Sequence, residues 1–318
     1  MSGSLGNGST WRQQDEDTLM APRTMWEAVR HNNVEAVNRF LNLGADPNVF
    51  ENNETTTPLI EASKYGFSRL VKLLLDHGAN ADRVDVGNNT ALHWAAILSH
   101  RKCAKILLNH NSPTEVVNNS GNTPLMEATA EINVKMVKIL LEHGASCCSK
   151  LNQWNKNALT IASSKGKMRL VSLLLHGTSP IEESSRELYA ALADAAAGKF
   201  VQVVQKLLDY GACTNFADET ILSPLHSAVR AGSVEVAKLL IKYGANLDEF
   251  DKDGYTPLMK AAKAGHVEMI KTLLYAGANA DRIIEDGRRR AYDLLPKARR
   301  AIVGRMLLLA EAADGTSN

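Results

Sequence analysis

A leucine-type position recurs along this chain of 318 residues at an almost constant interval of 33 or 34 residues. It is occupied by Met25, Leu59, Leu92, Leu125, Leu159, Leu192, Leu225 and Leu258. A second marker keeps the same period, namely Gly44, Gly78, Gly144, Gly177, Gly211, Gly244 and Gly277, with Asn111 where one glycine is due. Two residue types that share one period over most of a chain indicate a repeat array. In such an array the core residues serve the stacking of the units, so function is expected in the residues that differ between units.

A short phrase surrounds the recurring leucine in several units. It reads Thr-Pro-Leu-Ile-Glu-Ala at 57–62, Thr-Pro-Leu-Met-Glu-Ala at 123–128 and Thr-Pro-Leu-Met-Lys-Ala at 256–261. Phrase and period resemble those of ankyrin repeats, and the resemblance covers roughly residues 24 to 310. The resemblance implies an all-α solenoid of stacked helix-turn-helix units with hairpin loops, and it is nearly silent about function.

The physical chemistry of one unit agrees with the phrase. The Thr57 hydroxyl can cap a helix N-terminus, and Pro58 fits the first helical turn because its missing N–H is not needed there. Gly66 then turns the chain into a second helix over 70–75, and Gly78 ends that helix as a left-handed residue. Such a helix pair is too small to bury its own apolar face, so stacked neighbours must bury it for each other.

The repeat period divides the chain into five parts. We expect a disordered N-terminal tail at 1–21, repeats 1–5 at 22–182, repeats 6–8 at 183–282, a degenerate capping repeat at 283–310 and a disordered tail at 311–318. The first part is polar and lacks the apolar run of a signal peptide. The capping repeat keeps a second helical pattern, but its outer side is polar and basic.

The array has one irregular region. The fifth repeat loses a residue before Gly177, a loop of unusual composition follows, and Gly198 stands thirteen residues before Gly211 where twelve separate Gly66 from Gly78. Two interpretations remain open. Two stacks meet near residues 178–186 with altered curvature, or the array is continuous with one irregular repeat.

Composition excludes few partners but constrains the compartment. The formal net charge is +1, and no apolar stretch is long enough to span a bilayer. The four cysteines show neither zinc-ligand spacing nor a disulfide framework. We therefore expect a monomer in the cytosol, with the nucleus as the alternative.

Four histidines suggest a metal site at first sight, because they occupy the same position in consecutive units. They are His77, His110, His143 and His176. Stacked helices lie about 10 Å apart, whereas ligands of one zinc ion lie within about 4 Å of each other. These histidines are therefore predicted to cap helix C-termini. No nucleophile or phosphate-binding motif is present either, so we expect a protein without catalysis, cofactor or metal. For His93 and His226 the resemblance implies hydrogen bonds between neighbouring loops.

The resemblance also implies where partners bind, namely at the hairpin tips and the exposed side of the first helices, which line a concave groove. The candidate partner-binding residues are Lys64, Tyr65, Trp94, Ile97, Leu98, Glu131, Trp154, Lys165, Arg230 and Lys263. Four of them form an apolar patch in repeats two and three, although Trp94 is alternatively half buried between repeats. Trp154 is either an exposed anchor or a loop residue packed on its neighbour. The expected function is an adaptor that binds one or more proteins.

A basic C-terminal region supports a different function. Residues 282–305 hold eight basic and three acidic residues, Arg282, Arg288, Arg289, Arg290, Lys297, Arg299, Arg300 and Arg305 against Glu285, Asp286 and Asp293. Such a surface could attract nucleic acid or an anionic membrane, but it lacks the interleaved aromatics of single-strand binders. Solvated cap surface is the alternative, and nucleic acid is not the expected partner.

One residue is a candidate for modification. Hairpin asparagines of ankyrin repeats can be substrates of an asparaginyl hydroxylase that prefers a leucine eight residues earlier. Asn215, which Leu207 precedes by eight residues, fits this preference. The resemblance therefore implies hydroxylation at Asn215.

Overall fold

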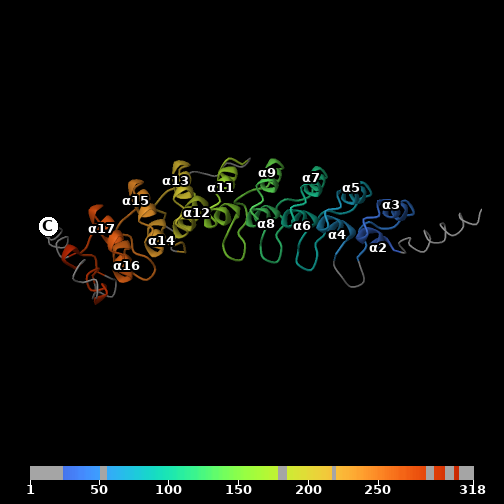
Figure 1. Ribbon diagram of the computed structural model, residues 1–318. Helices are drawn as coiled ribbons and strands as arrows, with labels where there is room; N and C mark the ends of the chain where they lie inside the picture. The colour runs from blue at the N-terminus through green and yellow to red at the C-terminus, as the bar shows by residue number, and fades with distance from the viewer. Residues whose placement is uncertain are drawn as a thin grey trace, which may run out of the picture. The chain divides into compact units, whose positions relative to one another are not determined.

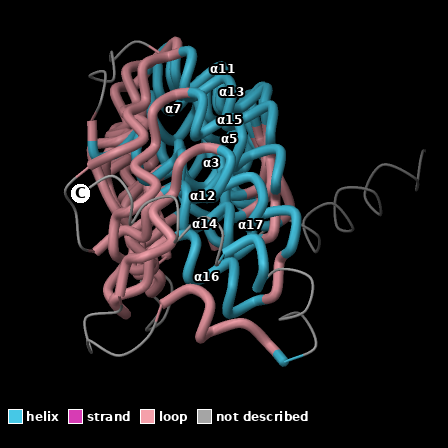
Figure 2. Tube along the Cα trace, turned by 90° about the vertical axis from the view of Figure 1, so that its left-hand side faces the viewer, coloured by secondary structure: helices cyan, strands magenta, loops and turns pink. Residues whose placement is uncertain are grey.

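The computed structural model describes residues 24–50, 56–177, 185–216, 220–283, 290–297 and 304–307. Within these ranges the regular structure is helical, apart from one isolated bridge between Val84 and Thr90 (Figures 1 and 2). The all-α prediction is thereby confirmed. The chain divides into two compact units, residues 1–128 and 129–318, which are described separately below.

Unit 1 is built from consecutive helix pairs. They are α2 (Met25–Arg30) with α3 (Val34–Asn42), α4 (Pro58–Lys64) with α5 (Ser68–Asp76), and α6 (Ala91–Ile97) with α7 (Arg101–Asn109). The next helix, α8 (Pro124–Ala130), contains the boundary between the units. First helices pack on first helices, as α4 does on α2 and α6, and second helices on second, as α5 does on α3 and α7 (Figure 1).

Unit 2 repeats this arrangement. Its helices are α9 (Val134–Glu142), α10 (Ala158–Ser164), α11 (Met168–Leu175), α12 (Arg186–Ala197), α13 (Val201–Asp209), α14 (Pro224–Ala231), α15 (Val234–Lys242), α16 (Pro257–Ala264) and α17 (Val267–Tyr275). The first helices α10, α12, α14 and α16 pack in sequence, and so do the second helices from α9 to α17. The predicted stack of helix-turn-helix units is therefore present in both parts.

The predicted capping and core residues behave as expected. The side chains of Thr57, Ser223 and Thr256 each accept a hydrogen bond from the N–H three residues on, and each precedes a proline in the first helical turn. Leu59 and Leu258, like the other recurring leucines, are buried. The phrase therefore fixes both the start and the inward face of the first helix.

A left-handed residue turns the chain between the two helices of each of repeats one to eight. These residues are Asn32, Gly66, Ser99, Ile132, Gly166, Lys199, Gly232 and Gly265. A second left-handed residue ends the second helix, at Gly44, Gly78, Asn111, Gly144, Gly211, Gly244 and Gly277. The sequence identified the second set well, but it identified only the glycines of the first.

The sixth repeat corrects one sequence interpretation. Lys199, with a φ of 61°, is the left-handed residue there, and it stands the usual twelve residues before Gly211. Gly198 instead has a φ of −80° and ends α12. A Cβ at Gly198 would lie 2.2 Å from Phe200, so this glycine provides space for the ring and does not supply the turn. The irregular glycine spacing therefore does not mark an irregular backbone.

The fifth repeat does lose a residue. Its second helix α11 has eight residues where the second helices on either side have nine, and Gly177 has no positive φ. The predicted junction near 178–186 falls mostly on residues 178–184, which lie outside the described residues. Both interpretations of that junction stay open.

Several other predictions also fall wholly or partly outside the described residues. These are the tails at 1–21 and 311–318 and most of the capping repeat. Of that repeat, residues 290–297 and 304–307 are described, and Ala291, Leu295 and Leu307 are buried.

Candidate functional site

Four of the hairpins that the structure describes share one turn, which precedes a first helix. An Asp or Asn side-chain oxygen accepts the N–H groups two and four residues further on, at distances of 2.8–3.1 Å. The residues that do so are Asp85 and Asn118 in unit 1 and Asn152 and Asp251 in unit 2. Such a turn holds the hairpin without help from a sheet.

In three of these four hairpins the other polar atom of this side chain bonds a residue nine positions further on, in the first helix, whereas the ninth residue after Asn152 is the apolar Ile161. We name this pair the hairpin lock. Asp85 Oδ2 accepts from Trp94 Nε1 at 2.7 Å, and Asn118 Nδ2 donates to Glu127 Oε1 at 2.8 Å. In unit 2, Asp251 Oδ2 lies 2.8 Å from Lys260 Nζ. An Asp thus faces a donor and an Asn faces an acceptor, so the two positions are chemically complementary.

In unit 1, five predicted partner-binding residues gather on α4, α6 and the turns that follow them. We name Lys64, Tyr65, Trp94, Ile97 and Leu98 the Trp94 surface. Lys64 Nζ lies 5.1 Å from the centroid of the Trp94 ring. Tyr65 is 52% exposed and Leu98 is 42% exposed, whereas Trp94 and Ile97 are half-buried. The structure therefore places Lys64 beside the four apolar residues, and the role of this surface in binding stays a prediction.

Two features of this surface were not predicted. Tyr65 stacks on Phe67, with ring centroids 5.6 Å apart. The indole N–H of Trp94 is occupied by Asp85, which makes Trp94 a structural residue as well as a surface residue. The nine-residue spacing between Asp85 and Trp94 is a signal in the sequence that could have revealed this lock.

The predicted residues of unit 2 are exposed, but they lie on different repeats. Trp154 is 60% exposed at its hairpin tip, so it is not packed on a neighbour. Glu131, Lys165 and Arg230 are also exposed, and Lys165 Nζ donates to the carbonyl of Ala130 at 2.7 Å. Their exposure permits binding, and their role in binding stays a prediction.

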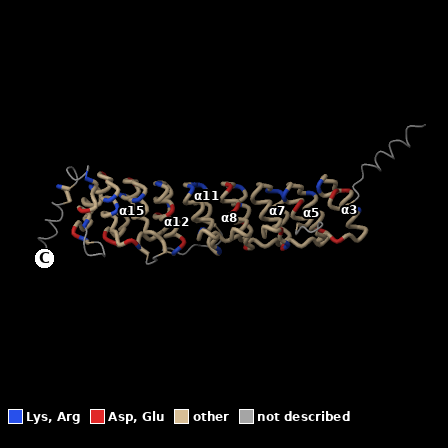
Figure 3. The backbone as a smooth tube through the Cα atoms, turned by 90° about the horizontal axis from the view of Figure 1, so that it is seen from below, with Lys and Arg blue, Asp and Glu red and all other residues tan. Residues whose placement is uncertain are grey.

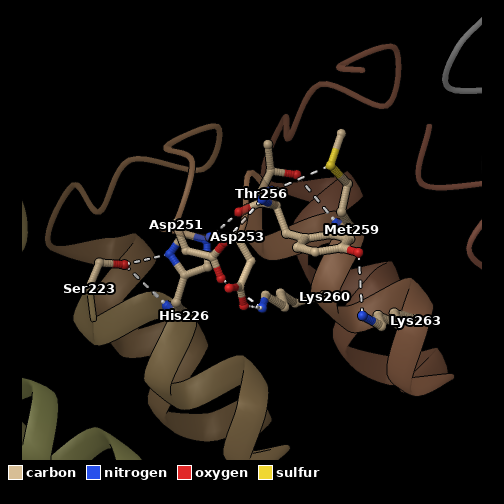
Figure 4. Close-up of polar contacts among 9 residues, drawn as sticks. Ser223, His226, Asp251, Asp253, Thr256, Met259, Lys260 and Lys263 are labelled. Carbon is tan, nitrogen blue, oxygen red and sulfur yellow. Dashed lines mark hydrogen bonds and ion pairs between the residues drawn. The ribbon is translucent and has the colours of Figure 1, made fainter. Parts of the chain in front are cut away.

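Lys263 belongs to a compact cluster near the end of unit 2 (Figure 4). Its ammonium lies 4.6 Å from the centroid of the Tyr255 ring and 3.4 Å from the Tyr255 hydroxyl. Lys260 lies 4.7 Å from the same ring and pairs with Asp251 and with Asp253, at 2.8 and 2.9 Å. Burial alone raises the pKa of the Asp251 carboxyl, but hydrogen bonds from Lys260 and the Tyr255 N–H outweigh it and hold that pKa below its usual value.

Two buried histidines link neighbouring hairpins, as the resemblance implied. His93 Nε2 donates to the carbonyl of Asn122 at 3.0 Å, and His226 Nε2 donates to that of Tyr255 at 2.9 Å. A carbonyl can only accept, so Nε2 carries the proton and Nδ1 faces the hydroxyl of the capping residue. Burial lowers the pKa of both imidazoles, against the raising effect of the carbonyl hydrogen bond.

The four repeated histidines lie at the C-termini of second helices. His77, His110, His143 and His176 are the residues that directly follow α5, α7, α9 and α11. His77 Nδ1 lies 2.9 Å from the carbonyl of Leu73. His143 Nδ1 lies 2.8 Å from the carbonyl of Ile139, so capping is supported for these two histidines. The described residues contain no cluster of three potential metal ligands.

Asn215 is exposed but its side chain is engaged. Its amide Nδ2 donates to the carbonyl of Gly244 at 2.8 Å, and its Oδ1 accepts from the N–H of Asn246 at 2.8 Å. Asn215 thus ties its hairpin to that of the next repeat. Hydroxylation at this residue stays a prediction.

The basic C-terminal region is only partly described. Arg282 stacks on Phe250 with its guanidinium 5.6 Å from the ring centroid, and Arg290 pairs with Asp281 at 2.9 Å. Arg288, Arg289, Arg299 and Arg300 lie outside the described residues. Elsewhere in each unit, basic and acidic residues are interspersed along the trace (Figure 3). Of the four basic residues of this region that the structure describes, Arg282 and Arg290 are therefore engaged within the protein.

Comparison with known proteins identifies relatives for almost the whole array. A family model described as "Ankyrin repeats (3 copies)" matches residues 25–116, 98–150, 110–186 and 189–283. The crystal structure of the human ASB11 ankyrin repeat domain superposes with a TM-score of 0.57 and 31% sequence identity, and the match covers 70% of this chain and 98% of that one.

Curated relatives match over shorter stretches. The ARF GTPase-activating protein Git of Drosophila melanogaster is 35% identical over 99 residues, which is 31% of this chain and 13% of that protein. The human Ankyrin repeat and SOCS box protein 2 is 40% identical over 79 residues, or 25% of this chain and 12% of that protein. The chain thus matches only about an eighth of the length of either relative. In the described ranges, no helix has the length and apolar character needed to cross a membrane.

Proposed function

Because this chain belongs to the ankyrin-repeat family, whose members are generally protein-interaction modules, we propose that it is a non-catalytic adaptor that binds a protein partner. The Trp94 surface is the proposed primary contact. The proposal rests on the exposure of Tyr65 and Leu98 beside a lysine that stacks on an indole. Tyrosine and tryptophan are enriched in binding hot spots, and a contiguous exposed apolar patch marks an interaction site.

The fold gives a physical reason to expect binding without catalysis. Each helix pair buries its apolar face against the neighbouring repeats, so the exposed hairpins and the exposed sides of the first helices are the surfaces available for recognition. Ankyrin repeats are typically non-catalytic. The Git protein is named as a GTPase-activating protein, but the match covers only 13% of its length, so its activity is not transferred to this chain.

Affinity capture with the full chain tests the proposal. The test variant is Tyr65→Ser/Leu98→Ser, which removes exposed apolar surface and leaves the Asp85–Trp94 lock intact. The matched control is Leu43→Ser, because Leu43 is 86% exposed directly after the second helix α3. We expect the double variant to lose captured proteins that the wild type and the control retain. An unchanged set of captured proteins would refute the assignment of this surface.

We further propose that Asn215 is hydroxylated. The proposed compartment is the cytosol or the nucleus, where the four free cysteines of the chain would stay reduced. The fixed orientation of the Asn215 amide by Gly244 and Asn246 means that a hydroxylase needs local opening of the hairpin. Mass spectrometry of the peptide that contains Asn215 tests this. The peptide should carry one added oxygen after incubation with the hydroxylase, and it should not do so in Asn215→Ala.

A further inference from the structure

Equivalent positions near the ends of the first helices of repeats seven and eight carry exposed cations, Arg230 and Lys263. Arg230 and Lys263 lie in the last turns of α14 and α16, and each stands two residues before a left-handed glycine, Gly232 or Gly265. Both side chains are exposed, and no described carboxylate lies within salt-bridge distance of either. Lys260, which lies three residues before Lys263 in the same helix, is by contrast paired with Asp251 and Asp253.

From this contrast we infer that repeats seven and eight bind an extended acidic segment of a partner protein, with one carboxylate on Arg230 and another on Lys263. The inference deepens the proposed function and rests on it, because it assigns the chemistry of a partner. The ligand class is a peptide that carries aspartate or glutamate. We name the site, which comprises Arg230, Tyr255, Lys260 and Lys263, the Tyr255 cluster.

The cluster is preorganised around one ring. Lys260 is held by Asp251, whose side chain is 2% exposed, and by Asp253. Lys263 has no such partner, and it is held only over the ring and near the hydroxyl of Tyr255 (Figure 4). An ammonium held by a ring loses less side-chain entropy when a carboxylate arrives, and its charge is still available.

The spacing of the two cations selects the shape of the ligand. Because α14 packs beside α16, equivalent residues of the two helices are about 10 Å apart. A polyproline II segment returns to the same side every three residues, after about 9 Å. A β-strand returns after two residues, about 7 Å, or four, about 13 Å. Two acidic residues three positions apart in a polyproline II segment therefore match the site best.

The same geometry disfavours a nucleic acid. Proteins that bind single strands stack bases on open aromatic rings. The Tyr255 ring already has two ammonium groups within 5 Å of its centroid, which compete with a base for that ring. The carboxylates of Asp251 and Asp253 would also repel closely spaced phosphates.

Fluorescence anisotropy with the full chain tests the inference. The probe is a labelled proline-rich peptide with two glutamates three positions apart. Comparison peptides carry glutamine at both positions, or place the glutamates next to each other. We expect the probe to bind about tenfold more tightly than either comparison peptide, and less tightly as salt is raised. Equal binding of the three peptides, or no binding of the probe, would overturn the inference.

Variants assign the binding to this site. Arg230→Glu/Lys263→Glu should weaken probe binding about tenfold or more. The control Lys238→Glu/Lys242→Glu makes the same change in net charge on the exposed side of α15 and should bind like the wild type. Arg230→Gln/Lys263→Gln provides a second test if charge reversal disturbs folding, which circular dichroism would reveal. Equal loss in the test and control variants would contradict the assignment.

Two outcomes separate this inference from the proposed function. If a single-stranded oligonucleotide or a phosphatidylserine vesicle binds through Arg230 and Lys263 while the probe does not, the ligand class is wrong. If the probe fails but Tyr65→Ser/Leu98→Ser still abolishes capture, the acidic ligand is wrong and the adaptor function stands.

Discussion

The Trp94 surface of unit 1 and the Tyr255 cluster of unit 2 use equivalent lysines in different ways. Lys64 and Lys263 both stand two residues before a left-handed glycine, and both stack on an aromatic ring. In unit 1 the ring is Trp94, which is itself a lock residue on the following repeat. In unit 2 the ring is Tyr255, from the hairpin of the same repeat, and the lock residue is Lys260. The same framework therefore presents an apolar surface in one unit and a cationic one in the other.

This difference shows which positions are free to specify a partner. The lock residue must complement the Asp or Asn of its hairpin, so its identity is constrained by folding. The residues three and four positions after the lock residue do not take part in the lock, so folding constrains their identity less. Examples are Ile97 and Leu98 after Trp94, and Lys263 after Lys260. Recognition is therefore expected to reside mainly in those later positions.

The largest expected effect is the loss of a lock acid. Asp251→Ala removes an acceptor of two backbone N–H groups and leaves the partly buried Lys260 with only Asp253. We expect a loss of about 3 kcal/mol in the free energy of unfolding. Asp85→Ala, whose helix partner is a neutral indole, should cost about 2 kcal/mol. Urea unfolding measures both, and equal losses would show that the charge of the partner is irrelevant.

Exchange of one lock type for the other tests complementarity directly. Asn118→Asp places a carboxylate against Glu127 and should cost about 2 kcal/mol, because Asn118 now donates to that residue. Adding Glu127→Lys recreates the Asp–Lys pair of unit 2. The double variant should regain at least about 1 kcal/mol relative to the sum of the single changes. Additive losses in urea unfolding would mean that the two positions are not coupled.

The buried histidines predict how stability depends on pH in both units. The pKa values of His93 and His226 are lowered by burial, so the unfolded chain binds protons more readily. Their contribution is complete above the unfolded pKa of about 6.5 and is lost as pH falls through the folded value. Each histidine can change the free energy of unfolding by at most about 1.4 kcal/mol per pH unit.

Substitution by glutamine isolates this contribution, since its amide can still donate to the next hairpin. His93→Gln and His226→Gln should each flatten the dependence of stability on pH between 7 and 5. Urea midpoints measured across that range provide the readout. A slope that stays unchanged in both variants would mean that each imidazole has the same pKa in the folded and the unfolded chain.

The fold was largely predictable from the sequence because its signals are local and repeated. Thr57 and Pro58 start a helix wherever the phrase occurs, and the recurring leucines are buried. The helix-terminal histidines were also predictable, since a residue that directly follows the last helical turn lies near carbonyls that lack a partner within the helix, as His77 and His143 do.

The errors and omissions arose where a contact between repeats decides the conformation. The sequence pattern indicated Gly198 as the turn residue, but Lys199 makes the turn. Position 198 is a glycine because a side chain there would collide with the ring of Phe200. The locks were missed because each member alone is an ordinary polar residue. Only the pair Asp85 and Trp94, read at a spacing of nine, has chemical meaning.

The smallest expected change in the free energy of unfolding concerns Ile132, and it tests whether this residue serves folding or partner binding. Ile132 adopts a φ of 58°, which is strained for a β-branched side chain, and it is 41% exposed beside Glu131. Ile132→Asn should therefore raise the free energy of unfolding by about 1 kcal/mol in urea unfolding, because asparagine tolerates this conformation. If the free energy of unfolding does not rise, contacts of the Ile132 side chain within the protein compensate for the backbone strain. Another outcome is a variant that is more stable and yet captures fewer proteins than Leu43→Ser. That result would assign Ile132 to the partner-binding surface, because backbone strain that does not stabilise the fold is then compensated by contacts with the partner.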